Sequence, residues 1–347
     1  MPTRRTIIAL TGAALTNRAW SALEHPAPTL VSAAANRPVT PPLLEMIDFV
    51  VTQAQRLDDN QGGAARIFVA DQFSAVARLL RSGSFGNTTG RRLAAAAAQL
   101  AQTIGFMSFD AAEDAQAQRW YLTGLRAAHA ADDRALSASI LALMSNQAAD
   151  AGHALDALQL ASAAQEAAAA APAAVRSLVT ARSSLAHAAA GDLTGFCRMR
   201  ETTLELLDTD PGALPPGWAS YIDPVELDAI MGRGLVVLAD RIPSRRKQLL
   251  RDASQLLYTR AHTDPTEPPQ RSALRHGAWL SLAQTAAGDL DQAVGTARMA
   301  LARLPVVTSV RSVELLHRLR ETLANDGRRS RAVQELLREL QELRRTR

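Results

Sequence analysis

The chain has 347 residues, of which 47% are hydrophobic and only 4% aromatic, and its formal net charge is +4. This length suffices for one large domain or two ordinary ones, and apolar content supplied largely by alanine favours many closely spaced helices over one bulky core. The single cysteine, Cys197, excludes an internal disulfide, and no run of about 18 uncharged apolar residues predicts a transmembrane helix, so we expect no membrane association.

The first element in chain order, residues 1–40, is predicted to be an N-terminal segment and linker. It starts with MPTRRTIIALTGAALT, in which Arg4 and Arg5 precede a short apolar stretch, as in a twin-arginine export signal. Arg18 and Trp20 follow closely, and the stretch is only mildly apolar. The alternative is therefore a linker with a short helix that packs on the first repeat of the body.

Residues 41–347 have helical periodicity almost throughout, without the alternating β-branched runs that predict a sheet. The predicted helices are separated by Gly, Asp and Pro and cover residues 42–58, 63–82, 87–107, 111–131, 133–151, 154–170, 173–190, 192–208, 221–240, 246–260, 270–287, 290–304, 309–325 and 328–345. The sequence therefore predicts an all-α fold.

Several helix pairs have the residue spacing of a tetratricopeptide repeat (TPR). In that repeat a Gly ends the first helix, small residues follow five and twelve positions later, and a Pro closes the second helix. These positions are occupied by Gly288, Ala293, Ala300 and Pro305, in part by Gly152, Ala157 and Ala164, more weakly by Gly191, Phe196 and Thr203, and in another variant by Ala112, Ala117, Tyr121 and Gly124. We therefore expect residues 41–347 to form a TPR-like helical-hairpin solenoid.

Two aromatic residues, Trp120 and Tyr121, lie on the second helix of one predicted hairpin. Tyr121 takes the position at which these repeats place a large aromatic side chain between neighbouring units. A structural role is therefore favoured over ligand stacking for both residues.

The last predicted helix has one apolar stripe, and its other faces are charged. The stripe is formed by Val333, Leu336, Leu337, Leu340 and Leu343. A solenoid needs a terminal helix with a polar outer face, so we interpret this helix as a cap. The alternative is a seam for a homodimer or another partner.

The basic residues are concentrated at the two ends of the chain. Residues 1–40 have four arginines and one glutamate, and residues 328–347 have seven arginines and three glutamates, which leaves about −3 for the body between them. The basic isoelectric point therefore does not indicate a broad surface for nucleic acid. We expect no sequence-specific DNA binding by this chain alone.

Three segments carry a resemblance to a known family: TRRTIIALTGAALT, MSFDAAEDAQAQRWYLTGLRAAHAADDRALSASILALMSNQAA and RSVELLHRLRETL. They resemble the C-terminal region of actinobacterial XRE-type transcriptional regulators, in which a helix-turn-helix domain precedes a TPR-like sensory region. The resemblance implies a cytoplasmic regulatory role and dimerisation. A helix-turn-helix domain needs on the order of 50–60 residues, and three residues precede Arg4. We therefore expect a stand-alone sensor or a truncated relative.

The sequence contains no recognisable catalytic, cofactor or metal motif. None of the seven histidines forms a His-x-x-x-His pair, and one cysteine cannot build a zinc cluster. A phosphate loop and a Gly-x-Ser-x-Gly elbow are also missing. Gly232-Arg233-Gly234 lacks the third glycine of a dinucleotide fingerprint and indicates a close helix contact instead. We expect no enzyme activity, no cofactor and no metal.

The TPR register also predicts which side chains face a concave ligand groove. The first helix of each hairpin lines that groove, and counting back from Ala112 and Gly152 selects these candidates: Gln99, Gln102, Phe106, Phe109, Asp110, Ser139, Asn146 and Asp150. Amide side chains both donate to and accept from a peptide backbone. Asp110 and Asp150 share one repeat position, so two stacked carboxylates would favour a cationic ligand group. The alternative is that these are ordinary core and solvated helix positions.

These observations predict a non-enzymatic regulatory binding protein. It would be a TPR-like sensor of a peptide, small molecule or protein partner, cytoplasmic and linked to transcriptional regulation. The alternative is a repeat-type binding protein exported by the twin-arginine route.

Overall fold

The computed structural model describes residues 9–24, 38–209, 215–219, 221–326 and 330–343. Within these residues the fold is all-α, as predicted, with fifteen α-helices, three short 3-10 helices and two isolated β-bridges. The α-helices are α1 (Ala13–Glu24), α2 (Pro41–Gln61), α3 (Arg66–Ser82), α4 (Asn87–Asp110), α5 (Asp114–Ala131), α6 (Arg134–Asp150), α7 (Ala154–Ala167), α8 (Ala173–Ala190), α9 (Leu193–Thr209), α10 (Pro224–Arg241), α11 (Arg246–Ala261), α12 (Gln270–Ala287), α13 (Leu290–Leu301), α14 (Val310–Asp326) and α15 (Arg331–Glu342).

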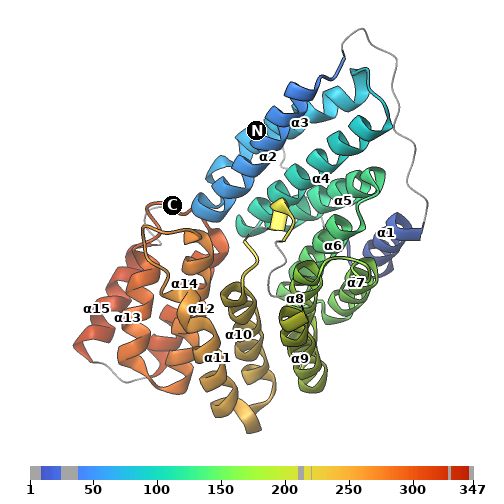
Figure 1. Cartoon of the computed structure of the whole chain (residues 1–347). Coiled ribbons are helices and arrows are strands. Elements are labelled where there is room, and N and C mark those ends of the chain that lie inside the picture. The colour runs from blue at the N-terminus through green and yellow to red at the C-terminus, as the bar shows by residue number, and fades with distance from the viewer. Residues whose placement is uncertain (1–8, 25–37, 210–214, 220, 327–329, 344–347) are drawn as a thin grey trace, which may run out of the picture.

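Consecutive helices from α4 onward form hairpins that stand side by side (Figure 1). The hairpins are α4–α5, α6–α7, α8–α9, α10–α11 and α12–α13. The first helices of neighbouring hairpins also pack on one another, since α6 contacts α4 and α8, and α10 contacts α8 and α12. One side of the row is therefore lined by the even-numbered helices α4 to α12.

The row of hairpins curves back on itself, so that its two ends meet (Figure 1). Helix α2 packs on both α4 and α12, and α14 reaches α4. The backbone is joined at the same place: the Gly63 amide donates to the Thr308 carbonyl, and the Thr308 amide donates to the Gln61 carbonyl, both at 3.0 Å. We call this contact of α2 and α4 with α12, α14 and the loop before α14 the closing junction.

Gly62 is required by the backbone geometry of the closing junction. Its φ is +64° and its ψ is −135°, a combination open essentially to glycine alone. A Cβ atom at this position would lie 2.4 Å from the Thr308 carbonyl oxygen. The glycine therefore lets the end of α2 approach the loop before α14.

Tyr121 has the structural role expected from the sequence. Its side chain is fully buried, and its ring lies against Gly105 of α4, where an added Cβ would come within 2.6 Å of two ring carbons. Trp120, on the neighbouring face of α5, packs edge-on against Phe73 of α3, with ring centroids 5.0 Å apart. Both aromatic residues thus hold α5 to other helices.

The N-terminal segment contributes a helix to the packed structure. Leu15 and Ala19 of α1 are buried where α1 meets α5 and α7. The Leu10 backbone exchanges hydrogen bonds with the Gln118 amide, at 2.6 and 2.8 Å, and the Gly12 amide donates to Asp156 at 2.7 Å. The second sequence interpretation expected a short helix on the first repeat of the body, whereas α1 packs on α5 and α7; Arg4 and Arg5 lie outside the described residues.

The C-terminal helix α15 packs on α13 and α14. Val333, Leu336 and Leu340 of its apolar stripe are buried there, and the Ser330 hydroxyl caps the helix by accepting from the Val333 amide. These three side chains are therefore covered within the chain and are not available as a seam for a second copy.

Candidate functional site

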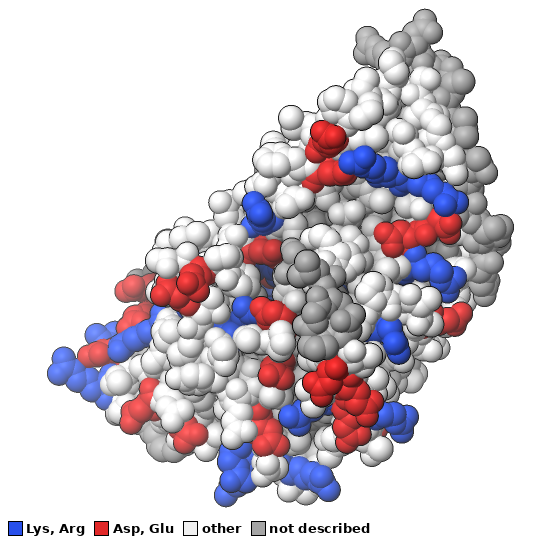
Figure 2. Space-filling model, in the orientation of Figure 1, with Lys and Arg blue, Asp and Glu red and all other residues white. Residues whose placement is uncertain are grey.

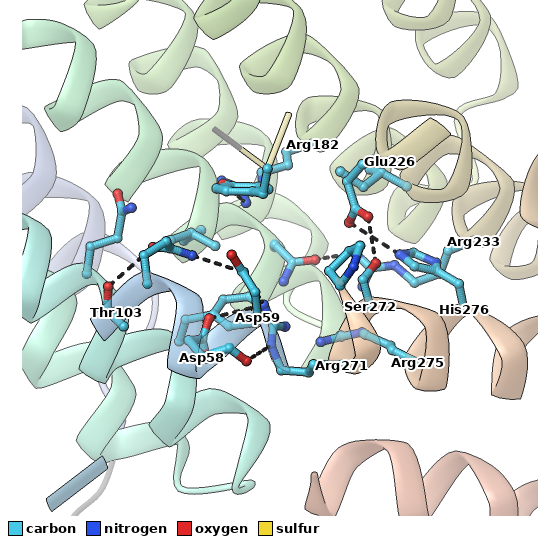
Figure 3. Close-up of a pocket in the computed structure, with 18 residues that line it drawn as sticks. Asp58, Asp59, Thr103, Arg182, Glu226, Arg233, Arg271, Ser272, Arg275 and His276 are labelled. Carbon is cyan, nitrogen blue, oxygen red and sulfur yellow. Dashed lines mark hydrogen bonds and ion pairs between the residues drawn. The ribbon is translucent and has the colours of Figure 1, made fainter. Parts of the chain in front are cut away.

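A cavity lies on the inner side of the helix row, next to the closing junction (Figure 3). Its volume is about 70 Å³, which is room for several water molecules or one small ligand group, because a water needs roughly 10–15 Å³ by the same measure. The lining residues are Gln55, Asp58 and Asp59 from α2, Gln102, Thr103 and Phe106 from α4, Leu143 and Asn146 from α6, Arg182 from α8, Glu226, Ile230 and Arg233 from α10, Arg271, Ser272, Arg275 and His276 from α12, and Tyr221 and Pro269 from loops.

One side of the cavity is an ion pair across the closing junction. Arg271 of α12 donates through Nε to the Asp58 carbonyl oxygen at 2.9 Å and through a terminal nitrogen to the Asp58 carboxylate at 3.1 Å. The same guanidinium lies 3.5 Å from the Asp59 carboxylate and 4.3 Å from the centroid of the Phe106 ring. Arg271 therefore holds α12 on α2 and α4 with its charge compensated.

A second group of polar residues surrounds Glu226 of α10 (Figure 3). Its carboxylate accepts from the Ser272 hydroxyl at 2.6 Å and lies 3.0 Å from Nε of Arg260 and 3.5 Å from Nε2 of His276. Burial raises the pKa of Glu226, but the hydrogen bond from His276 and the charge of Arg260 outweigh it and hold the pKa below its ordinary value. Glu226 is therefore an ionised, fully engaged acceptor.

The contacts of Ser272, His276 and Glu226 differ from those of a nucleophilic triad. In a triad the histidine contacts the serine hydroxyl and removes its proton. Here both Ser272 and His276 bond to Glu226 instead. Burial lowers the pKa of His276, which keeps the imidazole neutral and able to donate to the carboxylate.

Three further arginines line the cavity without a carboxylate partner among the described residues. Arg182 donates to the Tyr221 hydroxyl at 2.8 Å, and Arg233 donates to the Asn146 side-chain oxygen. Arg275 lies over the Phe109 ring, 5.2 Å from its centroid. All three side chains are buried, and Arg182, Arg233 and Arg275 are 8%, 8% and 5% exposed.

Three of the predicted groove residues line the cavity: Gln102, Phe106 and Asn146. The Gln102 side-chain oxygen is buried and accepts no hydrogen bond from the described residues. Gln99, one turn earlier on α4, borders a second small hollow beside Trp218, which shares Gln102 and Thr103 with the cavity.

The other predicted groove residues are bonded or buried within the chain. Ser139 and Phe109 are fully buried, and Asp110 is 1% exposed and accepts from the Ser309 hydroxyl at 2.8 Å. Asp150, which is exposed, pairs with Arg311 of α14.

Arg311 supplies from within the chain a cation for Asp150, one of the two aspartates that were predicted to attract a cationic ligand group. It also donates to the Phe109 carbonyl at 2.6 Å and lies 2.5 Å from the Asp114 carboxylate. The ends of α4 and α6 are thereby tied to α14 and contribute to the closing junction. Asp150 is thus paired with Arg311, whereas one Asp110 oxygen accepts from Ser309 and the other is buried with no hydrogen-bond partner among the described residues.

Most of the lining residues come from helices that the groove prediction did not use. The register was counted back only from Ala112 and Gly152, whereas the same count from Gly288 puts Arg275 at the second position, equivalent to Gln99. Asp58 and Asp59, near the end of α2, reach the cavity because α2 packs on α12, a contact for which the sequence holds no local signal.

Comparison with known proteins identifies no relative. No protein-family model matches the chain, and no curated protein and no solved structure matches it significantly. The resemblance to XRE-type regulators therefore remains a prediction from the quoted segments.

Membrane spans and metal sites were also considered for the described residues. In this part of the chain, no helix is both long and apolar enough to cross a bilayer. The same residues hold no group of three or more His, Cys, Asp or Glu side chains arranged to bind a metal ion.

Asp58 is expected to make stability depend on pH. Burial, opposed by Arg271 and reinforced by Asp59 and Asp110, raises its pKa from 3.8 to about 7 in the folded protein. The folded state therefore binds the proton more tightly, so this stabilisation is complete below about pH 4 and disappears as pH rises through 7. Relative to Asp58→Asn, the parent should lose up to about 4 kcal/mol of unfolding free energy between pH 4 and 8, at roughly 1.4 kcal/mol per pKa unit.

Urea unfolding of both proteins across this pH range measures the difference. Subtracting the two curves removes the opposite contribution of His276, whose pKa is lowered by burial. Parallel curves would show that Asp58 titrates at its ordinary pKa.

Proposed function

We propose that this protein is a non-enzymatic regulatory binding protein, a TPR-like sensor that takes a small molecule or the end of a peptide in its central cavity. The observation that carries the proposal is the position of the cavity. It is lined by α2, α4, α6, α8, α10 and α12, and therefore by both ends of the helix row at once. A ligand there contacts elements that are distant in sequence and meet only when the junction is closed.

The TPR-like assignment is supported by the close approach of helices at two residues of the predicted repeat pattern, Tyr121 and Ala300. Tyr121 of α5 lies against Gly105 of α4, and Ala300 of α13 lies against Gly277 of α12, where an added Cβ would come within 3.3 Å. Gly288 ends α12 with φ +93°, as the first-helix glycine of such a repeat requires.

Such a position suits a regulatory role. A ligand shifts an equilibrium between closed and open forms only if it binds one of them better. A ligand that bridges α2 and α12 favours the closed form, because opening the junction separates the two walls of its site. A partner protein that distinguishes the closed from the open junction would then respond to ligand binding.

We place this role in the cytoplasm and in transcriptional regulation, as the resemblance implies. The packing of α1 between α5 and α7 supports a retained N-terminal segment. On the face shown in Figure 2, basic and acidic residues are interspersed, which supports the absence of sequence-specific DNA binding by this chain alone. The alternative, export by the twin-arginine route, predicts loss of the first 30 or so residues, which N-terminal sequencing of the protein from its host detects.

Self-association of this sensor is also proposed, from the family resemblance alone. Since the α15 stripe is covered by α13 and α14, a homodimer would use another surface. Sedimentation at tens of micromolar measures it directly.

Gln102→Leu tests the binding function. The substitution removes an amide whose oxygen is buried without a hydrogen bond, so we expect the folded protein to keep its stability to within about 1 kcal/mol. Compounds and short peptides that raise the melting temperature of the parent should raise that of the variant less. The readout is thermal unfolding against a library of metabolites and of short peptides.

Gln99→Leu is the matched control, because Gln99 lies one turn earlier on the same helix and does not line the cavity. It should respond to the same compounds as the parent does. Two results would contradict the proposal: no compound stabilises the parent, or the compounds that do so stabilise Gln102→Leu equally.

A further inference from the structure

The three arginines without carboxylate partners distinguish this cavity from an ordinary buried ion-pair network. Arg182, Arg233 and Arg275 come from α8, α10 and α12, three neighbouring inner helices. Among the described residues, their guanidinium groups have a phenol, an amide oxygen and an aromatic ring as hydrogen-bond or ring partners. A terminal nitrogen of Arg182 and Nε of Arg275 are buried with no hydrogen-bond partner among the described residues.

The acidic residues of the cavity are already engaged. Asp58 and Asp59 share Arg271, and Glu226 is held by Arg260, Ser272 and His276. The lining contains four arginines against three carboxylates, so at least one guanidinium charge has no counterpart in the wall. Arg260, which lies outside the lining, pairs with Asp223 as well as with Glu226 and therefore does not change this count.

An unpaired buried charge costs several kcal/mol, and folded proteins rarely keep one without a partner. The effect of the environment is visible in the arginines themselves: burial, with the charge of nearby Arg275, lowers the pKa of Arg233 to about 9. Burial likewise lowers the pKa of Arg275. A negatively charged ligand group would relieve this cost at all three arginines.

We propose that Arg182, Arg233 and Arg275 form a binding site for a single oxyanion group, a carboxylate or a phosphate, carried by the ligand of the sensor. Guanidinium groups match both oxyanions because their planar N–H donors pair with two oxygens at a time. The cavity volume of about 70 Å³ has room for one such group. The inference rests on the proposed binding function and specifies its ligand class.

Two amide side chains next to the proposed anion site could bind the rest of the ligand. Asn146 accepts from Arg233, and the Gln102 side-chain oxygen has no hydrogen-bond partner in the part of the chain that the structure describes; both residues lie in the same lining. Amide side chains of this kind bond to a peptide group or to a hydroxyl. The expected ligand is therefore a small acid with a hydrogen-bonding group next to its carboxylate or phosphate.

Arg275→Met tests the site with inorganic phosphate and with acetate as probes. Each is added to the purified full chain at ionic strength matched with sodium chloride, and binding is measured from the melting temperature and by calorimetric titration. One or both anions should stabilise the parent more than chloride does, and the variant should bind roughly 10-fold to 100-fold more weakly, since a hydrogen bond to a charged group contributes on that order. The free variant should melt at or above the temperature of the free parent, because a buried unpaired charge has been removed.

Two further variants complete the experiment. Arg78→Met makes the same change in net charge at an exposed position of α3 outside the cavity, and it should respond like the parent. Arg182→Met removes a second arginine from another helix and should weaken binding even if Arg275→Met does not fold.

The outcomes separate the inference from the function on which it rests. A response to phosphate alone identifies a phosphate ligand, and a response to acetate alone a carboxylate. Equal responses of the parent and both cavity variants, or no response beyond that to chloride, would overturn the anion site. If a neutral compound then stabilises the parent but not Gln102→Leu, the binding function stands without it; if none does, both fail.

Discussion

Arg271→Ala is expected to lower the free energy of unfolding by about 3–5 kcal/mol. The substitution leaves the Asp58 carboxylate, 2% exposed, without its counter-charge and removes the donor to the Asp58 carbonyl. Because Arg271 joins α12 to α2, the loss falls on the closing junction. Urea unfolding gives the free energy, and hydrogen exchange at the end of α2 shows whether the junction opens before the remainder of the chain unfolds.

Arg298→Ala is the control for this effect. Arg298 pairs with Glu335 and Glu339 of α15 at 3.4 and 2.9 Å, but all three side chains are more than a third exposed. An exposed pair contributes about 0–1 kcal/mol, so the control should change little. The double variant Asp58→Asn with Arg271→Met should regain part of the loss, because no charge is then left unpaired. Equal effects of Arg271→Ala and Arg298→Ala would show that the junction pair behaves as a surface ion pair.

Gly105→Ala is expected to destabilise the protein by about 2 kcal/mol or more, although alanine is the better helix former. The new methyl group would lie 2.6 Å from two carbons of the Tyr121 ring, which is fully buried and cannot swing into solvent. The steric clash should push α4 and α5 apart. Thermal unfolding measures the effect, and Tyr121→Leu in the same chain should relieve the clash.

Gly295→Ala makes the same chemical change within α13, where an added Cβ meets nothing within 4 Å. It should raise stability by about 0.5–1 kcal/mol through helix propensity alone. A destabilising Gly105→Ala beside a stabilising Gly295→Ala isolates the contact with Tyr121. If both variants are stabilised, the close packing of α4 on α5 is wrong.

The helices follow largely from local properties of the sequence. The predicted range 173–190 coincides with α8 and 270–287 with α12. The prediction is less accurate where a turn follows a helix directly. The predicted helix 290–304 includes residues 302–304, which form a turn after α13 ends at Leu301. A turn of this kind keeps helical periodicity in the sequence, so only the backbone hydrogen bonds reveal the end of the helix.

The candidate site was only partly accessible to the same reasoning. The repeat register selected Gln102, Phe106 and Asn146 because residues on one face of successive helices share a spacing. It did not select Arg182 or Arg233, because the register was counted only through the helices that contain Gln102 and Asn146, whereas these arginines lie on α8 and α10. Their burial results from the helices that surround them.

The sequence by itself thus determined the all-α class, the order of the helices and the small residues that let paired helices approach, since these depend on helix propensity and on spacing within about 20 residues. Only the tertiary structure decided that the row closes, because the pair of Asp58 and Arg271 spans 213 positions of the chain and the bond of Asp110 with Ser309 spans 199. Contacts between residues so far apart in the chain depend on how every hairpin is rotated against the next one. A local sequence pattern does not contain this information. The same closure turns an open groove into a cavity and buries three arginines around it.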